Sequence, residues 1–247
     1  MRAFVRALGA TLVGLAVVWL VTAASDEGQL TVGARAGRSL PLAPLASAVG
    51  AALALGTPRV REEAHALETL GRSPAETARS AAYGAAVPSL VVAIAIAIAP
   101  QVDIAAFYPR APKGDTFVRS EDGFVSPSLS VAVSPDGTVR PMTNPAGDPG
   151  DSGLPHGARG SAALATGLAG LALALVSGRS VLRQSLLDRE GERRRRIAAL
   201  AQIVLCAVAT VFAFQAAAAR IAPAALAVVP PTLLLGAVML GYRRRHA

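Results

Sequence analysis

Two serines are the residues of this chain that could act as nucleophiles in an apolar environment. Ser47 and Ser89 each lie inside a long apolar run. A serine nucleophile needs a general base within hydrogen-bond reach, and neither run contains a histidine, lysine, aspartate or glutamate. Serines in such runs more often serve as small polar residues where helices meet. We therefore interpret both as packing residues and predict that the chain is not an enzyme.

The signatures of nucleotide hydrolysis and metal binding are missing from the sequence. It contains no Gly-x-x-x-x-Gly-Lys-Ser/Thr loop and no His-Glu-x-x-His pair. Cys206 is the single cysteine, which excludes a disulfide or a cysteine metal site within one chain. His156 stands alone in a polar stretch, where a histidine is usually solvated. The sequence predicts no cofactor and no metal.

A charged segment runs from Arg61 to Glu76, between two long apolar runs. Apolar residues recur there at three- and four-residue spacing: Val60, Ala64, Leu67 and Leu70. This spacing predicts an amphipathic helix over 59–71, ended by Gly71 as a left-handed C-terminal residue. Ser73, Pro74 and Glu76 carry the capping chemistry of a second helix that starts at once. The striped helix needs a partner surface, which is either a protein or the lipid surface.

The composition is that of an integral membrane protein. The chain is 53% hydrophobic and only 16% charged, and its apolar residues come in blocks. Spans of roughly 20 apolar residues are expected. They are 7–24, 40–56, 81–99, 161–177, 197–219 and 221–242. None of these cores contains Asp, Glu, Lys, Arg or His, which disfavours a proton- or ion-coupled transporter and a small-solute carrier working alone.

The charge distribution predicts the orientation. With a cytoplasmic N-terminus, the inner segments carry 16 bases and 7 acids and the outer ones 8 bases and 9 acids, giving +9 (16 − 7) and −1 (8 − 9). Both termini are then cytoplasmic. The net charge of +8 therefore reflects topology and not a nucleic-acid partner. The run from Arg193 to Arg196 stops the following span, with anionic-lipid contact as an added role.

The other segments are predicted as follows. A polar loop covers 25–39, and the second loop of the cytoplasmic side covers 178–196. Residues 101–160 form a small extracytoplasmic segment with a β-hairpin around Pro135-Asp136-Gly137. The chain thus divides into 1–100, 101–160 and 161–247. Residues 1–24 also fit a cleavable signal peptide, which stays an alternative.

Three prolines are expected to disturb the spans. Pro88 predicts a kink in the third span. Pro230 and Pro231 predict a break in the middle of the sixth span, and the short link at 220–223 predicts a tight hairpin of spans five and six.

Several sequence features resemble the LptF/LptG permeases, the membrane subunits of the lipopolysaccharide-export ABC transporter. Glu63-x-x-Ala66-Leu67-x-x-x-Gly71-x-Ser73 is similar to their coupling-helix signature, and Leu40-Pro41 to the opening of their second span. The stretch 221–236 with its basic tail is similar to their last span. The resemblance covers about the first 100 and last 90 residues.

The resemblance implies an inner-membrane permease of six transmembrane helices that pairs with a second permease subunit and a cytoplasmic ABC ATPase. It implies that Arg61, Glu63, Leu67 and Gly71 form the ATPase contact. The lipid substrate would be extracted between the first and last spans of this chain and those of its partner, and a periplasmic bridge protein would receive it. Arg35 and Arg38, just outside the membrane, are candidate contacts for lipid phosphates, with solvated loop charges as the alternative.

The chain also departs from this family. Its 101–160 segment is too short for the family's large β-jellyroll, and Glu68 stands where a basic residue is common. The competing hypothesis is a non-transporting membrane scaffold that recruits partners through its cytoplasmic loops, 57–80 and 178–196.

Overall fold

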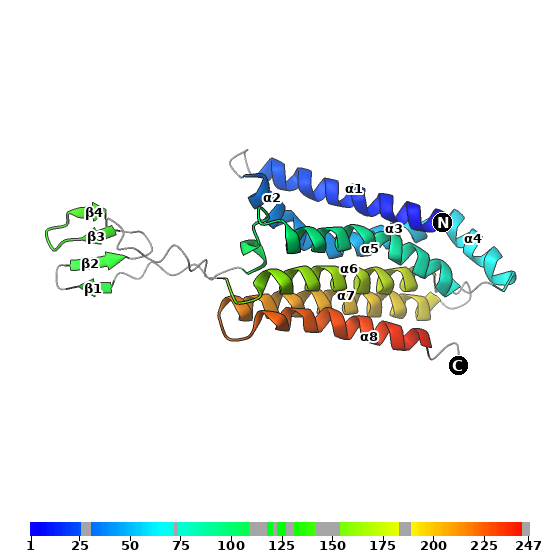
Figure 1. Ribbon diagram of the computed structural model, residues 1–247. Helices are drawn as coiled ribbons and strands as arrows, with labels where there is room; N and C mark the ends of the chain where they lie inside the picture. The colour runs from blue at the N-terminus through cyan, green and yellow to red at the C-terminus, as the bar shows by residue number, and fades with distance from the viewer. Residues whose placement is uncertain are drawn as a thin grey trace. The chain divides into compact units, whose positions relative to one another are not determined.

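The structure, a computed structural model, describes residues 1–25, 31–71, 74–108, 118–120, 123–126, 131–141, 154–182 and 189–243. The chain forms two compact units (Figure 1). A helical unit comprises Met1–Tyr108 and Pro155–Ala247, and a sheet unit comprises Pro109–Leu154. Residues 101–108 and 155–160, which the sequence grouped with the extracytoplasmic segment, belong by their contacts to the helical unit.

Six helical segments among the described residues are long and apolar enough to cross a membrane, as predicted. The helical unit is built from α1 (Arg2–Ser25), α2 (Val32–Ser39), η1 (Leu40–Leu42), α3 (Ala43–Gly56), α4 (Pro58–Thr69), α5 (Pro74–Ile98), η2 (Ala105–Phe107), α6 (Ala158–Leu182), α7 (Arg189–Ala218), η3 (Ala224–Val228) and α8 (Val229–Arg243). The second candidate span runs through α2, η1 and α3, and the sixth through η3 and α8.

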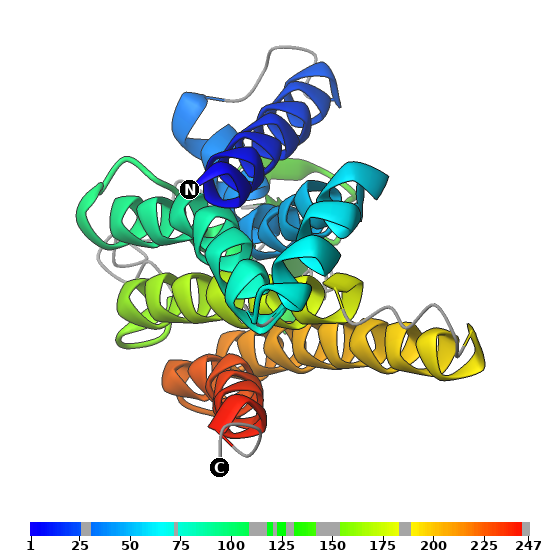
Figure 2. The same cartoon turned by 90° about the vertical axis from the view of Figure 1, so that its right-hand side faces the viewer.

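Helix α6 is the centre of the helical unit. It packs against α3 and α5 on one side and against α7 and α8 on the other, while α1 lies against α3 and α5 (Figure 2). As a result α6 is the most covered of the six candidate spans, and α1, α7 and α8 keep most of their surface exposed. Helix α6, whose apolar run 161–177 is short and rich in alanine and glycine, is therefore the central helix of this unit.

Small residues let these helices approach closely. A Cβ added at Gly170 of α6 would collide with the Ser89 side chain of α5, and one at Gly50 of α3 would collide with Thr11 of α1. Likewise, Gly84 of α5 lies against the backbone of Phe4. Lipid tails are as apolar as the helix surfaces, so the hydrophobic effect does not drive helices together within a membrane. Small residues such as glycine and alanine let the helix backbones approach and pack closely instead.

Two segments predicted as loops are helical. Residues Val32–Ser39 form α2, capped by Thr31, whose hydroxyl oxygen accepts the Ala34 amide at 3.3 Å. The glycines that suggested a loop instead allow close packing, because Gly33 lies against the Gln101 carbonyl and Gly37 against that of Asp103. Likewise α7 starts at Arg189 and includes the arginine run, since arginine and glutamate are good helix formers.

The last span differs from its prediction in where it breaks. Pro230 and Pro231 lie in the first turn of α8, after the 3-10 helix η3, so the break falls at the start of α8 and not in the middle of the span. Proline is tolerated there because the first amides of a helix have no intrahelical partner. Pro88 lies inside α5, and the predicted kink stays a prediction.

The link between α7 and α8 confirms the expected tight hairpin, since α7 packs against both η3 and α8. Helix α7 ends with Arg220 in the left-handed region at φ 59°. The Ile221 amide donates to the Ala216 carbonyl at 2.9 Å, and the Arg220 amide to the Ala217 carbonyl at 3.0 Å. This is the Schellman pattern, with arginine where glycine is usual.

The sheet unit is a four-stranded antiparallel meander. Its strands are β1 (Val118–Ser120), β2 (Gly123–Ser126), β3 (Val131–Val133) and β4 (Val139–Pro141), in that order. The β3–β4 pair, with Val133 opposite Val139, is the predicted hairpin, while β1 and β2 were not predicted. In its turn, hydrogen bonds from the Thr138 hydroxyl and amide hold the pKa of Asp136 below its usual value.

Candidate functional site: a charged helix at one end of the bundle

Helix α4 is delimited by local sequence chemistry. Its start is set by Thr57, which is extended (φ −71°, ψ 140°) and whose carbonyl accepts the amides of Val60 and Arg61 at 3.1 and 3.2 Å. Pro58 takes the first helical position, which suits its fixed φ. The helix ends before Gly71, which has φ +83°, as the sequence predicted. Ser73, the predicted cap of the next helix, lies outside the described residues.

The apolar stripe of α4 is covered by the chain itself. Val60 and Ala64 are only 3% and 6% exposed, and Val60 belongs to the main apolar cluster, together with Leu55 of α3 and Ala78 of α5. Leu67 is half-buried, but Leu70 is 81% exposed, so the prediction that Leu70 continues the stripe is wrong. The reason is local, because the helix ends at Thr69 and the last turn leaves the helical path. The partner surface for the stripe is thus the end of the bundle.

The described charged side chains of α4 are exposed. They include Arg61, Glu62 and Glu63, and the Glu63 carboxylate lies 3.8 Å from the Arg59 guanidinium on the solvent side. Such an exposed pair one helical turn apart contributes little to stability. The residues 58–71 carry two arginines against three glutamates. Helix α4 is therefore a mildly acidic element.

The structure places the four predicted contact residues on one short element, but not on one face. Arg61 and Glu63 are two positions apart, so they lie on opposite flanks of the helix. Leu67 is half-buried and lies one helical turn after Glu63, and Gly71 follows the last turn. A Cβ at Gly71 would meet nothing within 4 Å, so only its backbone conformation requires glycine.

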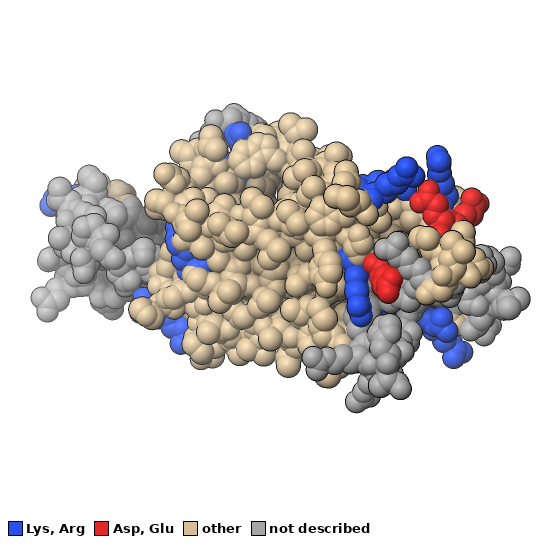
Figure 3. All heavy atoms as spheres, turned by 45° about the vertical axis from the view of Figure 1, so that its right-hand side comes forward, with Lys and Arg blue, Asp and Glu red and all other residues tan. Residues whose placement is uncertain are grey.

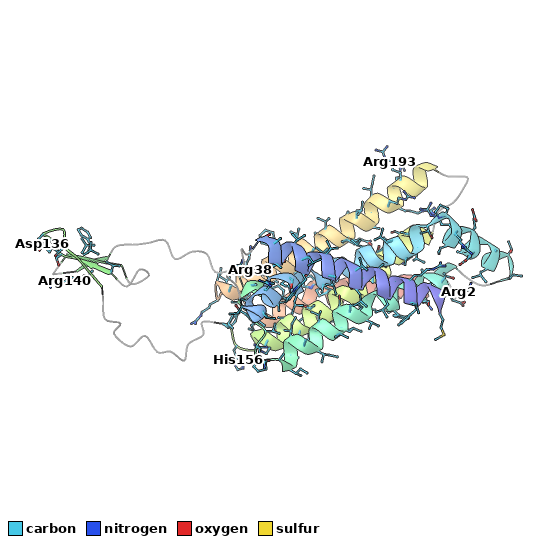
Figure 4. The ribbon with its side chains drawn as sticks, turned by 90° about the horizontal axis from the view of Figure 1, so that it is seen from above. Arg2, Arg38, Asp136, Arg140, His156 and Arg193 are labelled. Atoms are coloured by element: carbon cyan, nitrogen blue, oxygen red, sulfur yellow. The ribbon has the colours of Figure 1, made fainter. Side chains whose placement is uncertain are left out.

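The end of the helical unit that carries α4 is strongly basic. Figure 4 places Arg2 and Arg193 at one end of this unit, and Arg38 and His156 at the other. In Figure 3, acidic and basic side chains gather together around α4. The arginines of this end include Arg2, Arg6, Arg59, Arg61, Arg79, Arg179 and Arg193 to Arg196. The acidic α4 therefore stands out against a basic surrounding.

The opposite end carries the two candidate lipid contacts. Arg35 is half-buried and Arg38 is exposed, both on α2. Helix α2 is fixed there by the segment after α5, since the Asp103 amide donates to the Gly33 carbonyl at 3.4 Å. Arg35 and Arg38 are three positions apart and thus neighbours on the helix surface. Their phosphate-binding role stays a prediction.

Sequence reasoning missed a junction at this opposite end. Arg159 of α6 donates from Nη1 to the carbonyls of Ile96 and Ala99 at 2.9 and 2.7 Å, and from Nη2 to that of Val102 at 3.1 Å. The last carbonyls of a helix have no intrahelical donor, and Arg159 supplies donors to those at the end of α5. A lone arginine at the start of an apolar run was the only sequence signal.

Tyr108 closes the same junction. Its hydroxyl donates to the Ala158 carbonyl at 2.8 Å, and its ring meets that of Phe214 edge to face at a centroid distance of 5.1 Å. Phe107 contacts the same Phe214 ring at 5.7 Å. Burial raises the pKa of Tyr108 to about 12. The two chain segments that lead to the sheet unit are therefore joined to each other within the helical unit.

The two serines have the packing role that we predicted. The Ser47 and Ser89 hydroxyl oxygens lie 2.6 Å apart in a fully buried contact between α3 and α5. Ser177 of α6 similarly donates to the Ala48 carbonyl at 2.7 Å. Among the described residues, no group of three or more histidine, cysteine, aspartate or glutamate side chains could hold a metal ion.

No protein-family model, curated protein or solved structure matches this chain.

Proposed function

We propose that this chain is a permease subunit of an ABC-type exporter of a lipopolysaccharide-like lipid, driven by a separate cytoplasmic ATPase. It would reside in the inner membrane with both termini in the cytoplasm. The observation that carries the proposal is the packing of α4: Val60 and Ala64 of its apolar stripe are buried on the bundle, while its described charged side chains are exposed. The architecture of six candidate spans, with α4 after the second and an inserted unit after the third, supports it.

The packing of α4 on the bundle favours a protein partner over a lipid surface. An interfacial helix buries its apolar face among lipid headgroups. In α4 that face is already covered by the chain, and Val60 is only 3% exposed. The surface of α4 that is left for a partner is charged and mildly acidic, and it ends at the exposed Leu70. Such a helix surface suits a groove on a folded protein.

The connections of α4 suit the transmission of movement. Helix α4 links α3 to α5, and both of these pack on the central α6. A displacement of α4 by a motor protein would therefore act on two spans at once. The chain needs such an external source of work, because it has no P-loop motif and no Asp, Glu, Lys, Arg or His within its apolar cores.

The second permease subunit would cover the exposed apolar faces of the outer helices. Large apolar side chains are exposed on α1, for example Val13 at 65% and Leu20 at 66%, and on α8, where Leu233 is 69% exposed. Lipid would leave the membrane between these helices and those of the partner. Arg35 and Arg38 would meet its phosphates, and a periplasmic bridge protein would take it onward.

Co-purification tests this proposal. The full chain, tagged and extracted in detergent from its native membrane, should retain an ABC ATPase. Glu63→Arg reverses an exposed charge of α4 and should release the ATPase, and Gly71→Pro should do the same by forbidding φ +83°. Arg140→Glu, an equal charge reversal on exposed β4, is the control that should retain it.

Two results would refute the proposal. The first is a chain that retains other partners but no ATPase, which would support the scaffold hypothesis. The second is an ATPase that stays bound to the Glu63→Arg and Gly71→Pro variants alike. The thermal unfolding of each variant in detergent shows whether it is still folded, so loss of the fold is not mistaken for loss of the contact.

A further inference from the structure

The N-terminal part of α7 carries a ring of charge at the edge of an apolar span. Arg193, Arg194, Arg195 and Arg196 are all exposed, and they belong to the same continuous helix as the apolar residues that follow. Ile197, Leu200 and Leu205 are 55%, 61% and 71% exposed. The change from charged to apolar surface is thus complete within one residue. We call the four arginines the arginine collar.

The length of α7 places the collar at the depth of lipid headgroups. About 22 residues of α7 follow Arg196, which is roughly 33 Å at 1.5 Å per residue. The hydrocarbon core of a bilayer is about 30 Å thick. The collar therefore lies within about one helical turn of the hydrocarbon boundary, well inside a Debye length of about 10 Å from the phosphates.

The collar surrounds its helix. Four consecutive residues at 100° steps cover most of the circumference, and α7 at this point is exposed on nearly every side. A folded protein partner contacts one face of a helix, whereas lipid headgroups encircle it. Residues 189–196 hold five arginines and two glutamates, a local charge of +3 (5 − 2), so the excess is cationic.

We propose that the arginine collar binds the phosphodiester headgroups of anionic phospholipids. Arg193 and Arg196, three positions apart on the helix surface, can share one phosphate or hold two neighbouring ones. Such lipids would fix the depth of α7 in the bilayer. This site is separate from the ATPase contact on α4 and from the lipid contact on α2, and it does not rest on the proposed function.

Native mass spectrometry of the full chain tests the collar with phosphatidylglycerol as the probe. Arg193→Gln with Arg194→Gln should weaken phosphatidylglycerol binding by about fivefold per arginine, so roughly 25-fold for the pair. Phosphatidylcholine binding should not change. Arg193→Lys with Arg194→Lys keeps the charge and should stay within about threefold of the unmodified chain.

The matched control is Arg59→Gln with Arg61→Gln on α4. It removes the same charge from the same end of the protein, but from a helix whose local charge is not basic. It should change phosphatidylglycerol binding less than twofold. The proposal is overturned if the two glutamine pairs weaken binding equally, because net charge alone would then explain the effect. It is also overturned if the collar variant keeps its phospholipid, whether or not it loses a protein partner.

Discussion

The contact of Gly170 with Ser89 gives a sharp prediction about the core that positions α4. Gly170→Ala would drive a methyl group into the Ser89 side chain, whose Oγ would lie 2.6 Å from the new Cβ. That collision should also disturb the Ser47–Ser89 hydrogen bond between α3 and α5. Because α4 joins these two helices, the perturbation acts on the frame of the candidate site.

The expected magnitude follows from three contributions. Overpacking typically costs about 1–3 kcal/mol, and a hydrogen bond between membrane helices contributes about 0.6 kcal/mol. Replacing glycine by alanine in a helix returns up to about 1 kcal/mol. Gly170→Ala should therefore lower the free energy of unfolding by roughly 1–2 kcal/mol. Gly236→Ala on α8, where an added Cβ meets nothing within 4 Å, should be neutral or stabilising.

A double-mutant cycle separates this collision from any general effect. Ser89→Gly removes the obstructing side chain and should accommodate the methyl group of Gly170→Ala. The pair should then show a coupling energy of at least about 1 kcal/mol in the sense of rescue. Reversible unfolding of the detergent-solubilised chain by dodecyl sulfate, followed by circular dichroism, measures it. Additive effects within about 0.5 kcal/mol would refute the close packing of α5 on α6.

Three further predictions concern the ends of the helices. Tyr108 should titrate near pH 12 in an ultraviolet absorbance titration. Because its folded pKa lies above the usual value of about 10, its contribution to the free energy of unfolding should be full below about pH 10 and be lost as the pH rises through 12. Tyr108→Phe should remove this loss. Arg159→Met should lower the free energy of unfolding by about 2 kcal/mol. Amide hydrogen exchange should become faster first over residues 99–108. An equal increase of exchange along the whole chain would contradict the capping role. Arg220→Gly should raise the free energy of unfolding by about 1 kcal/mol, because φ 59° suits glycine, and a loss of stability would show that the Arg220 side chain matters more than its backbone.

Local chemistry made much of the fold predictable. Each span is a property of a contiguous apolar run, and the limits of α4 follow from Pro58 and Gly71, so both could be found from the sequence. The β3–β4 hairpin follows equally from its turn residues. The β1–β2 pair was not predicted, although Asp122-Gly123, where the sequence passes from β1 to β2, is a turn signal of the same kind and made this hairpin equally readable from the sequence.

Distant partners made the rest unpredictable. The glycines of α2 looked like loop residues because their partners, the Gln101 and Asp103 carbonyls, are about 70 residues away in the chain. The carbonyls that Arg159 binds lie in the last turn of α5 and in the segment after it, about 60 residues away in the chain, and no spacing rule finds them. At the candidate site, the sequence revealed the stripe of α4, but not that the bundle covers Val60 and leaves Leu70 outside.

The junction made by Tyr108 and Arg159 has a consequence for how this protein can change. The outgoing and returning chain segments are joined to each other within the helical unit, because the Tyr108 hydroxyl donates to the Ala158 carbonyl and Arg159 donates to the Val102 carbonyl. The helical unit thus sets the separation of the two ends of the insert by itself, and an insert of another size could replace the present one if its ends fit that separation.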